Sequence, residues 1–330
     1  MIVNKVEQLI GNTPVFNFES LTTLCQRNSI FGKIEGFNIG GSIKDRTALG
    51  LLRWAEKERG LRPGMTIVES SSGNLGVALA MLCAKRGYTF KCVVDPKTPQ
   101  HNVQAMKAFG AETILCTTTD SNGGYQIPRI NLAKHLETTD SNIVNLNQYE
   151  NNAAVEYHCK ETAAEIIRQM GSVDILVGCV STGSHLSGIS MAIKNHNPKA
   201  ITVAVEPVGS VIFGGMSKPF LQNGTGLSFT PRNYKASVID EEMKVNDIDA
   251  FSMCRKIAST EGLLIGGSSG AALHAAIHLK RQFKSPQKVL VILPDSGQKY
   301  LNTIFDDSWM CTNVNQLSNT EVVVELTEAI

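Results

Sequence analysis

The pattern of hydrophobic and polar positions becomes regular from about residue 64 onward. Short runs rich in β-branched residues alternate with stretches whose apolar positions repeat at helical spacing. Helices are expected over 74–86 and near 104–109, and strands over 66–69, 90–94, 112–116, 143–146, 174–179, 201–205 and 289–293. This alternation predicts an α/β fold of parallel βαβ units, with helices on both faces of the sheet. Ligands bind such folds beyond the carboxyl ends of the strands, where several Gly- and Ser-rich loops fall.

Two polar segments stand outside this pattern. Gly214–Asn233 is rich in Gly, Ser, Asn and Pro, which predicts a loop over the site. Glu321–Leu326 is either an edge strand, a surface that packs on a partner chain, or a solvated tail. The chain has no internal repeat and no low-complexity linker, so the pattern alone fixes no domain boundary.

Composition restricts the classes of partner. The chain has 330 residues, enough for two domains, and a net charge of +1, which indicates neither nucleic acid nor an anionic membrane as partner. We find no signal region and no stretch of transmembrane length. Eight cysteines without a C-x-x-C pair are typical of reduced thiols, so a cytoplasmic protein is expected. His274 and His278 are spaced as ligands, but no third ligand accompanies them and no metal is expected.

The stretch Asn38–Arg46 places a lysine directly after a tight turn. Two glycines allow the turn, Ser42 stands where a helix N-cap would be, and Lys44 follows inside the first turn. The helix dipole and burial both disfavour the charged form of an amine there. Such an amine can form a Schiff base and carry a proton. The alternative is an ordinary helix start on the surface.

Three further loops combine small residues and hydroxyls before a helix. Glu69–Asn74 offers N–H groups and hydroxyls to a carboxylate, while Asn74 either caps the helix or hydrogen-bonds a phenolate oxygen. Ser181–Gly188 is a phosphate cradle without a lysine, and Gly266–Gly270 precedes an Ala-rich helix. The P-loop and the dinucleotide-binding glycine motif are both absent, which argues against an NTPase or a dehydrogenase.

Together these motifs resemble the fold-type II pyridoxal-phosphate enzymes of the cysteine synthase and cystathionine β-synthase family. The resemblance extends from Ile10–Pro14 to Leu293–Leu301. It implies pyridoxal 5′-phosphate as cofactor, a homodimer, and two domains, each with a mostly parallel twisted sheet between helices in three αβα layers. The parts it implies are a smaller mobile substrate-binding domain (35–148), a larger cofactor-binding domain (1–34 and 149–310) and a C-terminal tail (311–330).

The resemblance also implies roles for single residues. Lys44 is the catalytic residue, which holds the cofactor as an internal aldimine and, once released, removes the Cα proton. Asn74 faces the 3′ oxygen of the cofactor and Ser268 faces its pyridine nitrogen. The residues implied to bind the substrate carboxylate are Ser71, Ser72, Gly73, Asn74 and Gln148. Those implied to hold the cofactor phosphate are Ser181, Thr182, Gly183, Ser184 and His185.

Two of these positions refine the expected chemistry. The family typically has T-G-G-T in the phosphate loop, and here Ser184 and His185 replace the last two residues. Backbone N–H groups still bind phosphate, and the His185 ring is expected to pack at the edge of the loop rather than react. A hydroxyl such as that of Ser268 cannot keep the pyridine nitrogen protonated, so the ring is a weaker electron sink. The expected reaction is β-elimination and replacement on a serine-type substrate.

Three stretches bear on the substrates, namely 93–97, 123–130 and 209–214. They resemble the N-(2-amino-2-carboxyethyl)-L-glutamate synthases of siderophore (staphyloferrin B) biosynthesis more than cysteine synthases. The implied reaction joins O-phospho-L-serine and L-glutamate and releases phosphate, giving a 2,3-diaminopropionate precursor. Arg129, on a helix beside the cleft, would bind the glutamate side chain or the substrate phosphate, whereas sulfide needs no guanidinium. The alternative is a surface arginine.

Two other functions stay open. One is a cysteine synthase that uses O-acetylserine or O-phosphoserine with sulfide. The other is a non-catalytic, cofactor-binding regulatory homologue, and the presence of Lys44, Asn74 and Ser268 speaks against it because an inactive copy has no need of them.

Overall fold

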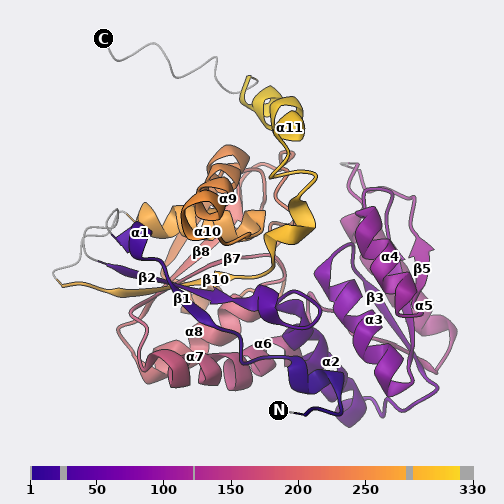
Figure 1. Cartoon of the computed structure of the whole chain (residues 1–330). Helices are drawn as coiled ribbons and strands as arrows, with labels where there is room; N and C mark the ends of the chain where they lie inside the picture. The colour runs from indigo at the N-terminus through magenta and orange to yellow at the C-terminus, as the bar shows by residue number, and fades with distance from the viewer. Residues whose placement is uncertain (1, 23–27, 122, 280–284, 320–330) are drawn as a thin grey trace.

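The strands form two sheets that lie side by side, each with helices packed on both faces (Figure 1). The computed structural model describes residues 2–22, 28–121, 123–279 and 285–319, the last five of them by backbone alone. The strand order is β1-β2-β10-β7-β8-β9 in the six-stranded sheet and β5-β4-β3-β6 in the four-stranded sheet. Neighbouring strands pair in parallel, except that β1 is antiparallel to β2. The predicted α/β class with parallel sheets is therefore confirmed.

The strands of the larger sheet are β1 (Val15–Asn17), β2 (Ser29–Ile34), β7 (Ile175–Cys179), β8 (Ile201–Pro207), β9 (Glu241–Val245) and β10 (Lys288–Leu293). Those of the smaller sheet are β3 (Thr66–Ser70), β4 (Thr89–Val94), β5 (Glu112–Leu115) and β6 (Ile143–Asn145). The described helices are α1 (Glu19–Thr22), α2 (Lys44–Glu58), α3 (Asn74–Arg86), α4 (Gln100–Ala108), α5 (Gln126–Thr139), α6 (Ala153–Tyr157), α7 (Ala163–Met170), α8 (Ser184–His196), α9 (Asp247–Glu261), α10 (Gly267–Ile277) and α11 (Asp307–Asn319). A π-helical turn, η3 (His158–Thr162), joins α6 to α7, and a 3-10 turn, η5 (Gly297–Tyr300), follows β10.

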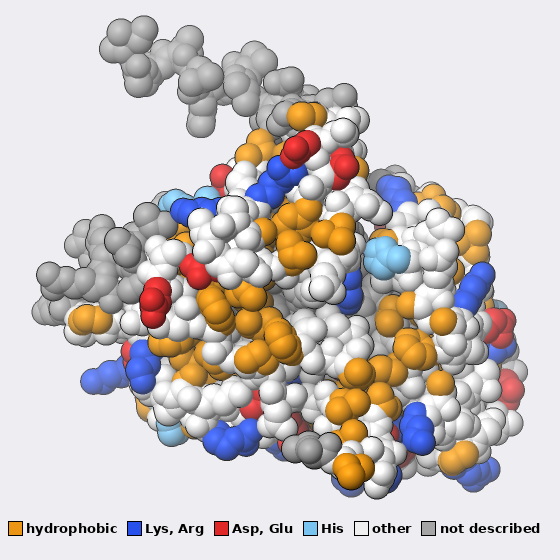
Figure 2. Space-filling model, viewed as in Figure 1, with side chains coloured by type: hydrophobic (Ala, Val, Ile, Leu, Met, Phe, Trp, Pro, Cys, Tyr) orange, Lys and Arg blue, Asp and Glu red, His pale blue; other side chains and the backbone are white. Residues whose placement is uncertain are grey.

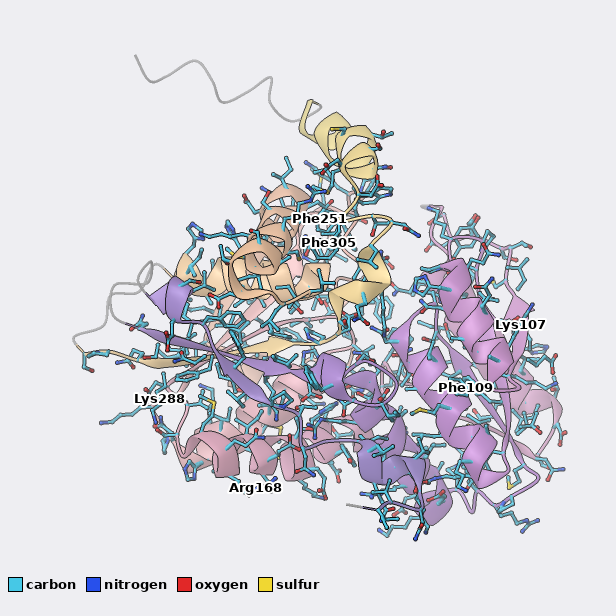
Figure 3. All side chains as sticks on the ribbon, in the orientation of Figure 1. Lys107, Phe109, Arg168, Phe251, Lys288 and Phe305 are labelled. Carbon is cyan, nitrogen blue, oxygen red and sulfur yellow. The ribbon has the colours of Figure 1, made fainter. Side chains whose placement is uncertain are left out.

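The larger sheet is buried on both faces because its central strands are apolar at every position. Successive side chains of a strand point to opposite faces. Val289 and Val291 therefore join the core beneath α9 and α10, whereas Leu290 and Ile292 join the core beneath α7 and α8. Figure 3 shows Phe251 and Phe305 together in the layer of α9 and α10, where both pack in the same core.

The smaller sheet follows the same rule. Ile67 packs with residues of α2 and α3, while its neighbour Val68 packs with Ala133 of α5 on the opposite face. The carboxyl ends of β3 and β4 are thereby held next to the start of α3. The division of the chain at residues 35 and 148 into two domains remains a prediction.

A buried ionic network anchors α2 to the larger sheet. The Glu165 carboxylate on α7 accepts hydrogen bonds from Lys33 Nζ at 2.5 Å and from both terminal nitrogens of Arg46 at 2.9 Å. Arg46 Nε also donates to Glu35 at 2.7 Å. Because Arg46 lies in the first turn of α2, these bonds fix the position at which that helix begins.

The predicted polar segments have different outcomes. Residues 214–233 contain neither helix nor strand, as expected of a loop. The first nine residues of the predicted tail, 311–319, belong to α11, and Val314 is buried against the larger sheet's core. Glu321–Leu326 lies outside the described residues.

Several absences concern only the residues that the structure describes. No helix among them is long and apolar enough to cross a membrane. Within the same residues, no group of three or more His, Cys, Asp or Glu side chains is placed to hold a metal ion. The seven cysteines of the described ranges are free thiols.

Candidate active site

Lys44 begins α2 and is held against the end of β10. Ile43 N donates to Pro294 O at 2.8 Å, and Ser42 forms a β-bridge with Asp295. The N-cap is Ile43 rather than the predicted Ser42, although the Ser42 hydroxyl still accepts the Lys44 N–H at 3.2 Å. The turn is formed one residue later than expected, and the lysine stays in the first helical turn.

Burial lowers the pKa of Lys44 to about 8, while the negative charge of Asp295 opposes this change. His185 lies close enough for the charge of Lys44 to act on it, and burial together with that charge lowers the pKa of His185 to about 3. The imidazole is therefore neutral at pH 7. An amine with such a pKa has a substantial neutral fraction near physiological pH, as a nucleophile and general base requires.

Asn74 is not the N-cap of its helix, so the interpretation of this residue as a helix cap is wrong. Gly73 is the N-cap, and no side-chain cap is formed. The Asn74 amide instead reaches across to the larger sheet, where its Nδ2 donates to Asp295 Oδ2 at 2.8 Å. Its Oδ1 accepts from Lys299 Nζ at 2.6 Å. Asn74 therefore lies near Lys44, because Asp295 is paired with the residues just before it.

The two segments predicted to bind a carboxylate are fastened to each other. Gln148 donates from Nε2 to Ser70 O at 2.8 Å and from its backbone N to Glu69 Oε2 at 3.1 Å. Ser71 Oγ accepts the Gly76 N–H at 3.0 Å and so stabilises the start of α3. Burial raises the pKa of Glu69 to about 7. Ser72 and Gly73 complete this turn at the end of β3.

The predicted phosphate loop precedes α8 and is covered by the segment around Asn233. Gly183 has φ of +82°, and a Cβ there would lie 2.5 Å from the backbone N of Tyr234, so only glycine fits. Asn233 Nδ2 donates to Ser184 Oγ at 3.3 Å and to Gln148 O at 2.9 Å. The first N–H groups of a helix lack partners within the helix, so the start of α8 can accept an anion, and the role of Ser181 and Thr182 there remains a prediction.

His185 is buried in the first turn of α8. Its ring makes an edge contact with His158 at 6.2 Å between centroids. Its Nε2 has no hydrogen-bond partner among the described residues. His158 is itself held between the hydroxyls of Thr47 and Thr162 at 2.9 Å each.

The other two predicted site residues, Ser268 and Arg129, lie on α10 and α5. Ser268 lies in the first turn of α10, and Cys179 Sγ donates to its carbonyl at 3.0 Å, so this loop adjoins the phosphate loop that follows β7. Arg129 lies on α5 with only 5% of its surface exposed, and its Nε is 3.0 Å from Asp95 Oδ2. The reading of Arg129 as a surface arginine is therefore wrong.

The loops expected at the site are linked by hydrogen bonds into one region at the carboxyl ends of both sheets. Figure 2 shows a hollow in the surface between the halves that carry the two sheets. Sequence reasoning missed Asp295, Lys299 and Asn233, which make the links. The polar run directly after the buried strand β10 was a signal for Asp295, because ligand-binding residues gather at such strand ends.

The residues present fit pyridoxal phosphate. The group needs an amine for its aldehyde, a cradle for its phosphate, and polar partners for its 3′ oxygen and ring nitrogen. Lys44 supplies an amine of lowered pKa, and the N-terminus of α8 supplies the cradle. The Asn74 amide and the loop that carries Ser268 lie in the same region and offer the remaining polar groups.

Comparison with known proteins agrees with this fit. A model of the family described as pyridoxal-phosphate dependent enzyme matches residues 6–295. An N-(2-amino-2-carboxyethyl)-L-glutamate synthase from Cupriavidus metallidurans is 35% identical over 314 residues, covering 94% of this chain and 92% of that protein. A cysteine synthase from Staphylococcus aureus is 35% identical over 311 residues, covering 92% of this chain and 98% of that protein.

Two solved structures have the same architecture. O-ureido-L-serine synthase superimposes with a TM-score of 0.84 at 30% identity, covering 94% of this chain and all of that one (100%). A hydrogen sulfide-producing enzyme from Fusobacterium nucleatum gives 0.83 at 34% identity, covering 91% and 100%. Fold, cofactor and relatives agree, and the chain belongs to the pyridoxal-phosphate dependent enzymes of fold type II, together with their β-replacement synthases.

Proposed function

We propose that this enzyme joins O-phospho-L-serine and L-glutamate to N-(2-amino-2-carboxyethyl)-L-glutamate with release of phosphate. The product is a precursor of 2,3-diaminopropionate, which places the enzyme in siderophore biosynthesis. Sequence identity does not distinguish glutamate from sulfide as the nucleophile, since relatives named as N-(2-amino-2-carboxyethyl)-L-glutamate synthase and as cysteine synthase are both 35% identical. The observation that carries the proposal is the buried guanidinium of Arg129.

The positions of the site residues support the roles proposed for them. When bound, pyridoxal phosphate supplies the aldehyde and the electron sink for β-replacement. Lys44 Nζ binds the cofactor and takes the proton from the substrate Cα. The residues proposed to hold the cofactor are Lys44, Asn74, Ser181, Thr182, Gly183, Ser184, His185 and Ser268. Those proposed to hold the substrate carboxylate are Ser71, Ser72, Gly73, Asn74 and Gln148.

We propose that Arg129 binds a second anion next to this carboxylate site. Its charge acts on the Glu69 carboxyl at the end of β3 and on the Tyr149 hydroxyl beside Gln148. Asp95 pairs with Nε, while Nη1 has no hydrogen-bond partner in the described part of the chain. A buried donor without a partner is costly, and a substrate carboxylate or phosphate satisfies it. Hydrosulfide would leave this fork without a matching acceptor.

Steady-state kinetics of Arg129→Ala tests this role. We expect the KM for glutamate or for O-phosphoserine to rise at least about tenfold, as expected for loss of a charged hydrogen bond. Lys134→Ala is the matched control, because Lys134 lies on the same helix with its side chain exposed and paired to Glu150. Unchanged KM values for both substrates in Arg129→Ala would remove the proposed role.

The substrate assignment is tested with the purified enzyme and O-phosphoserine. Phosphate release and product mass are followed with glutamate, with sulfide, and with neither. Product formation with glutamate but not sulfide supports the proposal, and the reverse supports a cysteine synthase. Bound cofactor colour without formation of either product would favour the non-catalytic, cofactor-binding homologue.

We also propose a homodimer. Phe37 and Ile39, 67% and 50% exposed, lie in the loop before Lys44, and Leu301 is exposed after η5. These segments adjoin, since a Cβ at Gly36 would lie 3.0 Å from Ser296 N. Exposed apolar side chains are visible in several groups on the surface (Figure 2). Covering such groups favours association, and Phe37→Glu should shift the molar mass measured by light scattering from dimer to monomer.

The compartment and the domain arrangement complete the proposal. Free thiols at the seven described cysteines fit a reducing compartment such as the cytoplasm. The proposed mobile substrate-binding domain spans 35–148, and it contains the smaller sheet together with α2.

A further inference from the structure

The Asp295 carboxylate is buried in the site with one oxygen unused. Its exposed fraction is 3%. Oδ2 accepts from Asn74 Nδ2 and from the Tyr300 hydroxyl, each at 2.8 Å. Oδ1 has no hydrogen-bond partner among the described residues. A buried carboxylate oxygen without a hydrogen-bond donor is energetically costly, so we expect it to gain a cationic partner during the reaction cycle.

The backbone places this carboxylate next to Lys44. Asp295 is bridged to Ser42, and Pro294 O accepts the Ile43 N–H at 2.8 Å. Room for the carboxylate depends on Gly266, where a Cβ would lie 2.1 Å from Asp295 Oδ1. Glycine at 266 therefore lets Oδ1 pack against the backbone at the start of α10, and the bridge to Ser42 holds Asp295 beside the segment that leads into Lys44.

The other titratable groups around Lys44 do not offer it a negative charge. Burial holds the pKa of His185 at about 3 and that of His158 well below its ordinary range, so both rings are neutral. Asp45 is turned away and accepts the Gly40 N–H at 2.6 Å. Among the described groups, Asp295 is the anion whose charge acts on the Lys44 amine.

We propose that Asp295 is the counter-ion of Lys44, a positioning residue that stabilises the ammonium formed when Lys44 takes a proton. In that step the substrate Cα–H bond breaks, an N–H bond forms at Nζ, and the electron pair stays with the substrate carbon. Oδ1 then accepts from the new ammonium group, and Asn74 and Tyr300 hold the carboxylate in place. The inference rests on the proposed role of Lys44. It extends that role by giving the Lys44 amine a partner, the Asp295 carboxylate. The group proposed to face the pyridine nitrogen of the cofactor is the Ser268 hydroxyl.

The test is the pKa of Lys44 in the full-length chain freed of cofactor. Competitive acylation is measured against pH by mass spectrometry of the Lys44 peptide, with exposed Lys107 (Figure 3) as internal reference. Wild type should show an inflection near pH 8. Asp295→Asn should lower it by about one unit or more, because removal of an opposite charge disfavours the ammonium. The acidic limb of the kcat profile, which reports the enzyme with substrate bound and Lys44 released, should move to lower pH in the same variant.

Two variants separate charge from structure. Tyr300→Phe removes a hydrogen bond to Asp295 and keeps its charge, and Asp45→Asn removes another buried carboxylate beside Lys44. Both should leave the inflection unchanged. An unshifted inflection in Asp295→Asn, or an equal shift in Tyr300→Phe, overturns the proposal.

Folding and the proposed function have separate controls. Asp295→Ser replaces Asp295→Asn if the latter does not fold. Failure of both to fold while Asp45→Asn folds would assign a purely structural role and also overturn the proposal. If borohydride leaves no pyridoxyl group on wild-type Lys44, the proposed function fails. The pH dependence of Lys44 acylation still tests whether Asp295 is the counter-ion of Lys44.

Discussion

Glu165→Gln removes one charge from the ionic network that positions the helix of Lys44. Hydrogen bonds and opposite charges from Arg46 and Lys33 outweigh burial and lower the pKa of Glu165 from its ordinary 4.5 to about 2. At 1.36 kcal/mol per pKa unit, this difference corresponds to about 3 kcal/mol of stability at pH 7. The figure agrees with the loss of roughly 3–5 kcal/mol expected when one partner of a buried pair is removed.

The sign of the pH dependence follows from the lowered pKa. The contribution of Glu165 is present above pH 4.5 and is lost as the pH falls through 2, because the unfolded chain takes up the proton first. Urea unfolding should therefore show Glu165→Gln about 3 kcal/mol less stable at pH 7, and about half of that at pH 3. Glu161→Gln, an exposed position just before α7, should change little. Equal stability of the two variants, or a pH-independent difference, would refute the reasoning.

Two further outcomes are expected. Gly183→Ala and Gly110→Ala both place alanine at positive φ, +82° and +84°. Gly110→Ala should lose about 1 kcal/mol in thermal unfolding, and Gly183→Ala should lose more, because its Cβ would also lie 2.5 Å from a backbone nitrogen. Only Gly183→Ala meets the backbone of Tyr234, so only that variant should weaken cofactor affinity measured by fluorescence titration; equal affinities would contradict the proposed cradle. Burial raises the pKa of Asp45 from 3.8 to about 7, so wild type loses stability as the pH rises from 4 to 7. Over that range the stability of Asp45→Asn should fall by about 1 kcal/mol less than that of wild type, or by a larger difference. Identical dependence of stability on pH in calorimetry would exclude the effect.

Much of the fold follows from local pattern. The strongly apolar runs that became β7, β8 and β10 are buried on both faces, so their composition alone marks them as central strands. Three strands, β1, β2 and β9, escaped prediction. β9 reads Glu241–Val245 with alternating half-exposed positions at the sheet edge, and β2 contains the buried Lys33. That lysine is tolerated only because Glu165, far along the chain, pairs with it.

The site was predictable as a set of loops but not as a set of contacts. Glycine and hydroxyl residues mark the loops after β3 and β7 because a turn at a helix start needs them. The partner of Asn74 is a carboxylate 221 positions away in the sequence, and no local signal distinguishes that pairing from an N-cap. The burial of Arg129 likewise depends on Asp95, which a helix pattern over 126–139 does not reveal.

Borohydride reduction of the holoenzyme, followed by peptide mapping, tests the central claim most directly. We predict one pyridoxyl adduct, on the ε-nitrogen of Lys44, and none in a Lys44→Ala variant prepared in the same way. An adduct on a different lysine, or no adduct at all, would contradict the account of this site.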